Sequence, residues 1–494
     1  MSKRKTRTTA PPNPSELQAQ MLADLLPFLP PEEETALRAA LSAELPPVIR
    51  LNPLKQDLDR FQTALEARYG WKLNPVAFSQ QGFSVEGAQQ PVSMTLEHRL
   101  GEYYIQDAAS MLPPELFDLS GLEEPLLLDM AASPGGKTTH LAERLDDRGL
   151  ILANDSSRDR LSALKIVLQN CGTTNCAVSN FHGEFFGGWF PETFDAVLLD
   201  APCSMQNLRA SENHPLRPIS AREQTALARR QYRLLESAVQ ALKTGGQVVY
   251  STCTLSPIED EQVLDMLLSA YPDAVEVEDV SSRFLAPGLA AVGAKILHPQ
   301  AARGLRLWPH RFHTSGFFAA LLRKTGRTAV KTAAPPSREL SNAGFTILTP
   351  GESQTLWNAL ESQFGLEQST LLAGRDNGLL AFGQRVFLVP QRYLHDFAML
   401  PVSYLGLEIG QWQAGRLHLR HEFVSRFQRA FARAGLTMKD EKANRWLAGE
   451  DIEDTGSYPD WPLPLYDRTG RFLGLARKAD GKLRNLLPAR IKSR

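Results

Sequence analysis

The chain has 494 residues, which is too long for one ordinary domain, so we expect two to four domains. Its composition, with 43% hydrophobic and 22% charged residues, is typical of a soluble globular protein. The formal net charge of -1 excludes any argument for a nucleic-acid partner from global charge, so such a partner would require local basic surfaces.

The sequence contains no apolar run near the length of a membrane span and no signal-peptide core. We therefore expect a cytoplasmic protein without membrane contact. We also expect it to act as a monomer. Four cysteines in so long a chain indicate a reducing compartment and not a disulfide framework. Cys171 and Cys176 have no second Cys/His pair at zinc-site spacing, so we expect no metal.

The N-terminal part, residues 1–102, predicts two helices followed by a small α/β unit. The first helix begins with Asn13 as its N-cap and Pro14 at its first position. The other predicted elements are a helix at 32–41, a strand at 47–53 with Arg50 pointing outward, a helix at 58–69 and an irregular strand region at 71–83. This part either contacts RNA or serves packing alone; the sequence does not decide between the two.

From about Tyr103 the pattern changes to alternating strands and helices, which we assign to one domain at 103–325. The predicted strands are 126–129, 149–155, 175–179, 194–200 and 246–250, with helices at 158–169, 225–243 and 259–270 and a closing hairpin at 304–308 and 316–322. Such alternation predicts an α/β fold with a parallel sheet and right-handed crossovers.

A linker at 326–340 separates this domain from the remaining chain. We expect an α/β connecting region at 341–395 and a β-barrel-like domain at 396–494, because short strands there are joined by glycine turns. Basic residues cluster toward its end: Arg416, Arg420, Arg471, Arg477, Lys478, Lys482 and Arg484. They predict either RNA binding or an ordinary solvated face.

A loop of small residues follows the first core strand and opens a helix. Its residues are Ala131, Ala132, Ser133, Pro134, Gly135, Gly136 and Lys137. A phosphate-binding loop would need a glycine where Ala131 stands, so a nucleotide-triphosphatase is excluded. Asp155 ends the next strand, and an acid about 20 residues further along the chain suits the binding of a ribose hydroxyl pair. The loop therefore predicts a nucleoside-bearing cofactor without a pyrophosphate, such as S-adenosylmethionine; the alternative is a tight turn with no ligand.

Two cysteines follow the ends of two strands that we expect to be neighbours. Asp200-Ala-Pro-Cys203 ends one strand, and Ser251-Thr-Cys253 ends the next. C5 of a pyrimidine is a poor nucleophile, but a thiolate that adds to C6 activates it. Asp200 can hydrogen-bond or protonate N3, and Lys137 favours the thiolate. The target base must leave its stack to be reached.

Three motifs together resemble the Sun-type RNA (cytosine-5) methyltransferases. They are Asp129-Met-Ala-Ala-Ser-Pro-Gly-Gly-Lys-Thr138, Asp200-Ala-Pro-Cys203 and Tyr250-Ser-Thr-Cys-Thr254. The C-terminal segment, residues 474–488, is similar to the RNA-binding region of the bacterial branch that methylates 16S ribosomal RNA. The resemblance implies a Rossmann-like, mostly parallel seven-stranded sheet, with an N-terminal α+β extension and a C-terminal PUA-like RNA-binding domain.

The resemblance also implies roles for individual residues. Cys253 would be the nucleophile toward C6, and Cys203 would assist release of the methylated product. The loop residues 131–137 and Asp155 would bind S-adenosylmethionine, and Asp200 would lie between cofactor and base.

Two positions depart from the family's pattern. His182 stands where the family has an acid near the adenine, and Met205-Gln-Asn207 replaces a Gly-x-Gly turn after the first cysteine. The leading hypothesis is a methyltransferase acting on ribosomal RNA. The alternatives are a transfer-RNA methyltransferase and an inactive RNA-binding factor in ribosome assembly.

Overall fold

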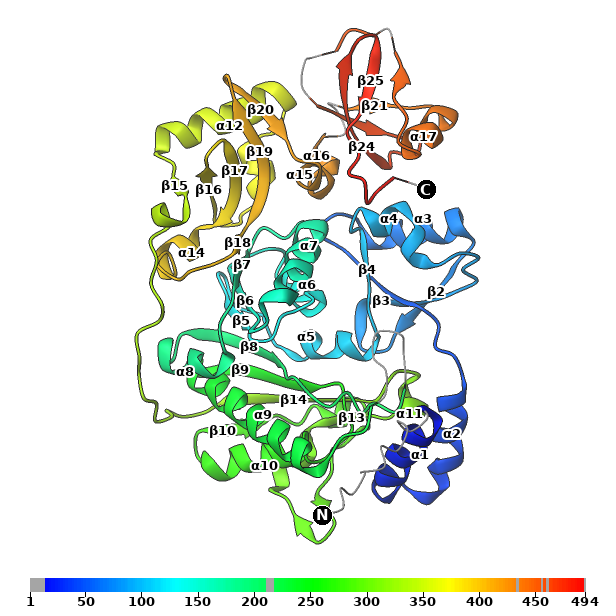
Figure 1. Cartoon of the computed structure of the whole chain (residues 1–494), viewed down its shortest axis with the longest axis vertical. Helices are drawn as coiled ribbons and strands as arrows, with labels where there is room; N and C mark the ends of the chain where they lie inside the picture. Colours follow the sequence, from blue (N-terminus) through cyan, green and yellow to red (C-terminus); the bar gives the residue numbers. More distant parts are fainter. Residues whose placement is uncertain (1–13, 210–216, 432–434, 455, 459–461, 493–494) are drawn as a thin grey trace, which may run out of the picture.

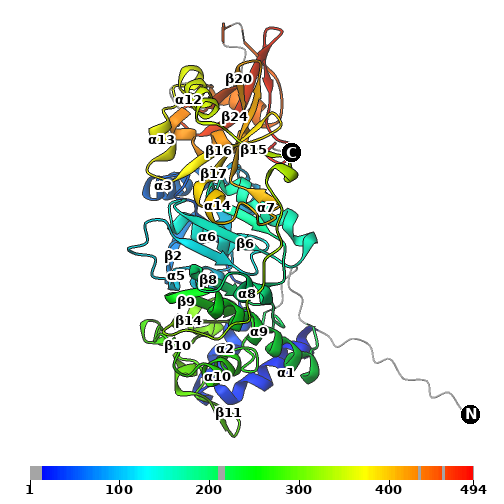
Figure 2. The ribbon, with the colours of Figure 1, turned by 90° about the vertical axis from the view of Figure 1, so that its left-hand side faces the viewer.

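The structure is a computed structural model that describes residues 14–209, 217–431, 435–454, 456–458 and 462–492. The molecule is elongated, with the N-terminal helices at one end, the largest sheet between, and the C-terminal sheet at the other end (Figure 1). The view turned by 90° shows the same order along the long axis (Figure 2). Among the described residues, no helix is long and apolar enough to cross a membrane.

Two helices begin the described chain, α1 (Pro14–Leu25) and α2 (Glu34–Ser42). Both agree with the predicted elements, while the predicted cap Asn13 lies outside the described residues. A four-stranded antiparallel sheet follows, in the order β2-β3-β1-β4. Its elements are β1 (Val48–Leu51), α3 (Leu58–Tyr69), β2 (Lys72–Val76), β3 (Ser79–Glu86) and β4 (Tyr103–Ile105).

The helix α3 has its predicted bounds because a capping residue lies at each of its ends. Asp57 caps the start by accepting from the backbone N–H of Arg60 at 3.2 Å, and Gly70 ends the helix with φ 67°. The strand β4 lies beyond the predicted boundary at residue 102, since it pairs with β1. The N-terminal sheet therefore includes the first strand of the segment that we assigned to the next domain.

The prediction that Arg50 points outward is wrong. Its side chain is 0% exposed and forms an ion pair with Glu143 of the core, with 2.7 Å between Nε and Oε2. The alternation of side chains along a strand shows which residues share a face, but it does not show which face another layer of the protein covers. The face of β1 that carries Arg50 packs against the core domain, so the guanidinium is buried there.

A nine-stranded sheet forms the core, in the order β10-β14-β9-β8-β5-β6-β7-β18, with β13 pairing on β14. The predicted strands are present as β5 (Leu126–Asp129), β6 (Leu150–Asn154), β7 (Cys176–Ser179), β8 (Phe194–Asp200) and β9 (Leu242–Thr252). Neighbouring pairs among these five are parallel. The sheet is completed by β10 (Val275–Val277), β13 (Leu305–Leu307), β14 (Phe317–Lys324) and the late strand β18 (Tyr404–Leu405). The predicted Rossmann-like fold class is confirmed. The predicted closing hairpin is β13 and β14, whereas β10 and β18 are strands that we did not predict.

Helices cover both faces of this sheet. One face packs against α5 (Leu112–Leu116), α6 (Gly136–Arg144) and α7 (Leu161–Cys171). The other packs against α8 (Phe186–Trp189), α9 (Ala221–Ala241) and α10 (Glu261–Ala270). Burial on both faces explains why the central strands have uninterrupted apolar runs.

Residues 326–339 form no helix or strand, as expected of the linker. Beyond them lies a five-stranded sheet in the order β15-β16-β17-β19-β20. Its elements are β15 (Phe345–Ile347), α12 (Pro350–Phe364), α13 (Gln368–Leu372), β16 (Asn377–Phe382), β17 (Arg385–Pro390), α14 (Gln391–Asp396), β19 (Leu407–Gln413) and β20 (Arg416–Leu419).

The predicted boundary between residues 395 and 396 divides this sheet, because β17 pairs with β19 across it. The helices α15 (His421–Arg426) and α16 (Gln428–Phe431) then lead to a second five-stranded sheet, β21-β23-β24-β25-β22. It contains β21 (Leu436–Thr437), α17 (Asp440–Leu447), β22 (Ile452–Glu453), β23 (Leu463–Tyr466), β24 (Phe472–Ala479) and β25 (Lys482–Asn485). The small C-terminal β unit thus begins after α16 and not at residue 396.

Candidate active site

The predicted site residues gather at one edge of the core sheet. The parallel strands β5, β6, β8 and β9 all end there, and α6 begins there. Asp200, the last residue of β8, is the register partner of Ser251 in β9. The carboxyl ends of parallel strands form the usual ligand crevice of such sheets.

An ion pair lies at the centre of this edge. The Nζ of Lys137 donates to Oδ2 of Asp200 at 2.7 Å, and the hydroxyl of Ser251 donates to Oδ1 at 2.8 Å. Burial alone would lower the pKa of Lys137, but the charges of Asp200 and Cys253 raise it above its ordinary value. Lys137 therefore stays cationic, and its Nζ lies 5.7 Å from the ring centroid of Phe317.

The two cysteines meet directly. The sulfurs of Cys203 and Cys253 are 3.2 Å apart, and both residues are free thiols of intermediate exposure. The hydrogen bond with Cys253, followed by burial, raises the pKa of Cys203 well above its ordinary value. Either thiol can donate in this contact, and the raised pKa of Cys203 favours its protonated form.

The small-residue loop is tied to the second parallel strand. The backbone N–H of Ala132 donates to the carbonyl of Asn154 at 2.8 Å, and that of Ser133 donates to Oδ2 of Asp155 at 3.1 Å. The other oxygen of Asp155 accepts from the backbone N–H of Ser157 at 2.8 Å. Asp155 thus first shapes the loop; its Oδ2 also lies 3.8 Å from the guanidinium of Arg160, and its Oδ1 keeps a second lone pair for a ligand hydroxyl.

The loop has room only for glycine where it turns into α6. Gly135 has φ 111° and no side chain caps the helix start. A Cβ on Gly136 would lie 2.8 Å from the ring of Tyr104. An uncapped helix start presents unpaired N–H groups and a partial positive charge, which suit a carboxylate. These features fit the amino-acid end of S-adenosylmethionine, and Asp155 fits its ribose.

Asp129 is a site residue that we did not predict, although it begins the loop motif. It is almost fully buried and its Oδ2 accepts from the hydroxyl of Thr138 at 2.7 Å. Burial raises the pKa of Asp129 to about 7. His182, in contrast, lies on the surface, where its ring meets that of Phe185 edge-on at 6.0 Å between centroids.

The turn after Cys203 is fixed by the loop that follows Cys253. The carbonyl of Gln206 accepts from the backbone N–H of Leu255 at 3.1 Å, and that of Asn207 accepts from Gly316 at 3.1 Å. Met205 has φ 58°, a left-handed conformation that glycine adopts without strain. The turn therefore joins both cysteine loops to the closing hairpin.

The N-terminal helices cover this turn. Leu208 is fully buried in a cluster with Met21, Leu25, Leu37 and Leu255. Its carbonyl accepts from the side-chain amide of Gln18 at 2.7 Å. Residues 14–42 thus pack directly on the segments that carry the cysteines, a contact that no sequence pattern indicated.

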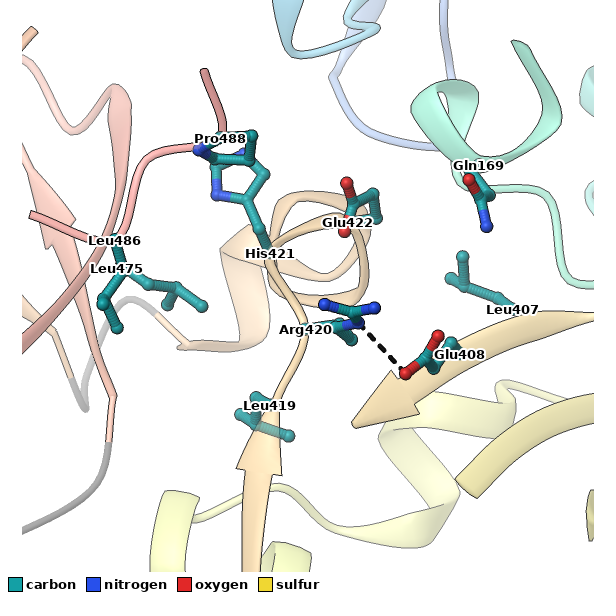
Figure 3. Close-up of a pocket in the computed structure, with 10 residues that line it drawn as sticks. All are labelled: Gln169, Leu407, Glu408, Leu419, Arg420, His421, Glu422, Leu475, Leu486 and Pro488. Carbon is teal, nitrogen blue, oxygen red and sulfur yellow. Dashed lines mark hydrogen bonds and ion pairs between the residues drawn. The ribbon is translucent and has the colours of Figure 1, made fainter. Parts of the chain in front are cut away.

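A cavity of about 430 Å³ lies elsewhere. It is enclosed by α7, by the five-stranded sheet that contains β19 and β20, and by the C-terminal sheet (Figure 3). Its lining includes Gln169, Glu408, Arg420 and His421, and Nε of Arg420 bonds Oε1 of Glu408 at 3.0 Å. Burial lowers the pKa of His421 to about 3, so its ring is neutral. The cavity belongs to the junction of the three sheets and shares no residue with the cysteine site.

The strand order and the loop between β5 and α6 define the chain as an S-adenosylmethionine-dependent methyltransferase. A solved methyltransferase homologue from Pyrococcus horikoshii is 30% identical and has a TM-score of 0.54, covering 62% of this chain and 99% of its own. The structure of PH0851 is 25% identical, has a TM-score of 0.53, and covers 64% of this chain and 70% of its own.

More specifically, the chain belongs to the 16S rRNA methyltransferase RsmB/F family. Residues 117–323 match the family model of that description, and residues 17–108 match the N-terminal domain of 16S rRNA methyltransferase RsmF. The ribosomal RNA small subunit methyltransferase F of Erwinia tasmaniensis is 33% identical, with 93% of this chain and 94% of the relative covered. That of Cronobacter sakazakii is also 33% identical, with 92% and 91% covered.

Proposed function

We propose that the chain transfers a methyl group from S-adenosylmethionine to C5 of a cytosine in 16S ribosomal RNA, through a covalent adduct between Cys253 and C6. The observation that carries this proposal is the contact between two thiols, 3.2 Å apart, beside the Lys137–Asp200 ion pair. Family membership and the printed names of the relatives support the RNA substrate.

The adduct explains why this site needs both a thiol and an ion pair. The thiolate of Cys253 attacks C6, and the electrons of the C5–C6 bond move onto the ring toward N3. N3 takes up a proton as the negative charge reaches it, and the resulting N3–H donates to the carboxylate of Asp200, while the cationic Lys137 behind it balances the charge. C5 is then nucleophilic and can accept a methyl group.

Release reverses the first step. C5 loses its proton, the C5–C6 double bond re-forms, and the bond between C6 and the sulfur of Cys253 breaks. Cys203 retains its proton because of its raised pKa, and it lies in contact with the leaving sulfur. We assign it the role of proton donor to Cys253 during this elimination, and the Cys203 thiolate that results accepts the proton from C5.

The cofactor supplies an electrophilic methyl group when bound. The residues that would hold it are Ala131, Ala132, Ser133, Pro134, Gly135, Gly136, Lys137, Asp155 and Asp200. His182 would contribute at the adenine only from the surface, so we expect it to matter least. We also expect the protein to act as a monomer in the cytoplasm.

Bisulfite sequencing of RNA from a deletion strain tests the substrate. Loss of one protected cytosine in 16S ribosomal RNA, restored by the wild-type gene, is the expected result. Loss in transfer RNA would support the alternative substrate. No change in either RNA would support the remaining alternative, an inactive factor in ribosome assembly.

The covalent step has its own test in two cysteine variants. Cys253→Ala should abolish methylation and form no adduct, because the attacking sulfur is missing. Cys203→Ala should accumulate a protein–RNA adduct that survives denaturing electrophoresis. Cys171→Ala, which changes a buried cysteine away from the site, is the control and should do neither. Full turnover by Cys253→Ala would refute the assignment of the nucleophile.

A further inference from the structure

Two buried polar side chains hold the loop that carries Cys203. Gln231 in α9 and Glu259 just before α10 are both 0% exposed. The Nε2 of Gln231 donates to the carbonyl of Pro202 at 2.9 Å and to Oε2 of Glu259 at 3.0 Å. The same carboxylate oxygen accepts from the backbone N–H of Ser204 at 2.9 Å. The residues on both sides of Cys203 are therefore fixed by one hydrogen-bonded pair.

This pair also joins the loop to the segment that carries the other cysteine. Glu259 lies in the connection between β9 and α10, and Cys253 begins that connection. The hydroxyl of Ser204 donates to that of Thr254, next to Cys253, at 3.3 Å. If the loop moved away from this connection, the sulfurs of Cys203 and Cys253 would separate from their distance of 3.2 Å. The carboxylate of Glu259 thus sets how closely the two cysteines approach.

Packing alone does not account for an acid at position 259. The Oε1 of Glu259 is buried and has no hydrogen-bond partner among the residues that the structure describes. Burial raises the pKa of its carboxyl group above the ordinary value. A buried carboxyl group with one oxygen unpaired costs stability, so its presence calls for a role that an apolar side chain would not fill. Holding the backbone of Ser204 is such a role.

We propose that Glu259, held by Gln231, is the positioning residue that keeps Cys203 in contact with Cys253 for release of the methylated product. This inference rests on the proposed function and adds two residues to its release step. Cys203 acts in release, whereas Cys253 makes the attack. Loss of the pair should therefore slow release and leave formation of the adduct unchanged. A misplacement of about 1 Å is enough to slow a reaction roughly 100-fold.

Two variants disrupt the pair from opposite sides. Glu259→Ala removes the acceptor, and Gln231→Leu removes the donor at a similar side-chain size. Each protein is mixed with a 16S ribosomal RNA transcript and S-adenosylmethionine, and denaturing electrophoresis follows the covalent adduct through one turnover. In both variants the rate of release should fall about 10- to 100-fold, so that adduct accumulates. The rate of adduct formation should stay at the wild-type value.

A conservative variant and a matched control separate positioning from other effects. Glu259→Gln should release product at close to the wild-type rate, because its amide oxygen accepts the same two hydrogen bonds. The control Glu236→Gln changes an acid of α9 that accepts from the hydroxyls of Tyr232 and Tyr271, both at 2.9 Å. It should alter neither adduct formation nor release. Melting temperatures of all variants confirm that they are folded.

The contact between the cysteines is also measured without RNA. Dibromobimane becomes fluorescent when it joins two neighbouring thiols, so its reaction reports on the distance between Cys203 and Cys253. The wild type and Glu259→Gln should be joined at the same rate, whereas the two disrupted variants should be joined more slowly. Cys171 and Cys176 are buried, so they should contribute little to the signal.

Several outcomes would overturn the inference. Equal slowing of adduct formation and release in Glu259→Ala and Gln231→Leu would indicate a general loss of structure, and unchanged release would show that the pair is not needed. If Glu259→Gln released product as slowly as Glu259→Ala, the role would belong to the negative charge and not to the hydrogen bonds. Absence of any adduct in Cys203→Ala, with thiol joining as expected in the other variants, would instead refute the proposed function, because the joining reaction requires no RNA.

Discussion

The buried pair between Arg50 and Glu143 offers a sharp test of how the N-terminal sheet supports the cofactor loop. Arg50 donates to Glu143 through Nε at 2.7 Å and Nη2 at 2.9 Å. It also donates to the carbonyl of Gly136 and the hydroxyl of Thr139, both at 2.8 Å. Gly136 and Thr139 lie in the first turn of α6, where the loop ends, and Glu143 lies in its last turn, so Arg50 contacts both ends of the helix.

Arg50→Met removes every one of these bonds and leaves the carboxylate of Glu143 buried without its partner. Both side chains are 0% exposed, so we expect a loss of about 3–5 kcal/mol in the opening free energy of α6. The double variant Arg50→Met/Glu143→Leu should recover most of this loss, because apolar side chains replace the whole pair. Affinity for S-adenosylmethionine should fall in the single variant.

Hydrogen exchange of the amides in α6, followed by mass spectrometry, measures this opening free energy, and calorimetry measures cofactor binding. The control is Arg38→Met, which breaks an exposed pair with Glu34 and should cost about 0–1 kcal/mol. If the double variant were as unstable as Arg50→Met, the loss would not come from an unpaired buried charge. If α6 exchanged as in the wild type, the proposed support would be refuted.

Two other predictions concern the sheet edge and the turn. Asp129→Asn should remove a pH dependence of the protein's stability. The pKa of Asp129 is about 7 in the folded protein, against an ordinary value of 3.8. Its contribution to stability is therefore fully present below pH 3.8 and is lost as the pH rises to about 7. Urea unfolding across that window checks this, and equal slopes for variant and wild type would contradict it. Leu208→Ala should destabilise the packing of α1 on the turn by roughly 2–5 kcal/mol, because Leu208 is fully buried. Faster exchange of amides in α1, together with slower methyl transfer, is the expected result, and unchanged exchange would speak against it.

The sequence determined local elements well where their limits are set by nearby residues. The strand β8 and the helix α3 have their predicted bounds, since an apolar run and a capping pair define them. The meeting of Cys203 and Cys253 was also predictable, because parallel neighbouring strands end at one edge.

What the sequence missed depends on contacts between distant segments. The burial of Arg50 requires α6, more than 80 residues away, to cover its face of β1. The pairing of β17 with β19 across residue 395 follows from the order of strands, which periodicity does not encode. The turn that contains Met205 is held by contacts of Asn207 and Leu208 with the closing hairpin and α1, so no pattern within the turn predicts them.

The late strand β18 has a consequence for how the protein is made. Tyr404 pairs with Val178 at the edge of the core sheet, and the backbone N–H of Ser403 donates to the carbonyl of Val178 at 2.7 Å. During synthesis, the edge of β7 stays uncovered until the chain has passed residue 405. An uncovered edge is a template for pairing with other chains. We therefore expect nascent chains that end before β18 to aggregate, even though every predicted site residue has been synthesised. Chains that end just after β20 should not aggregate.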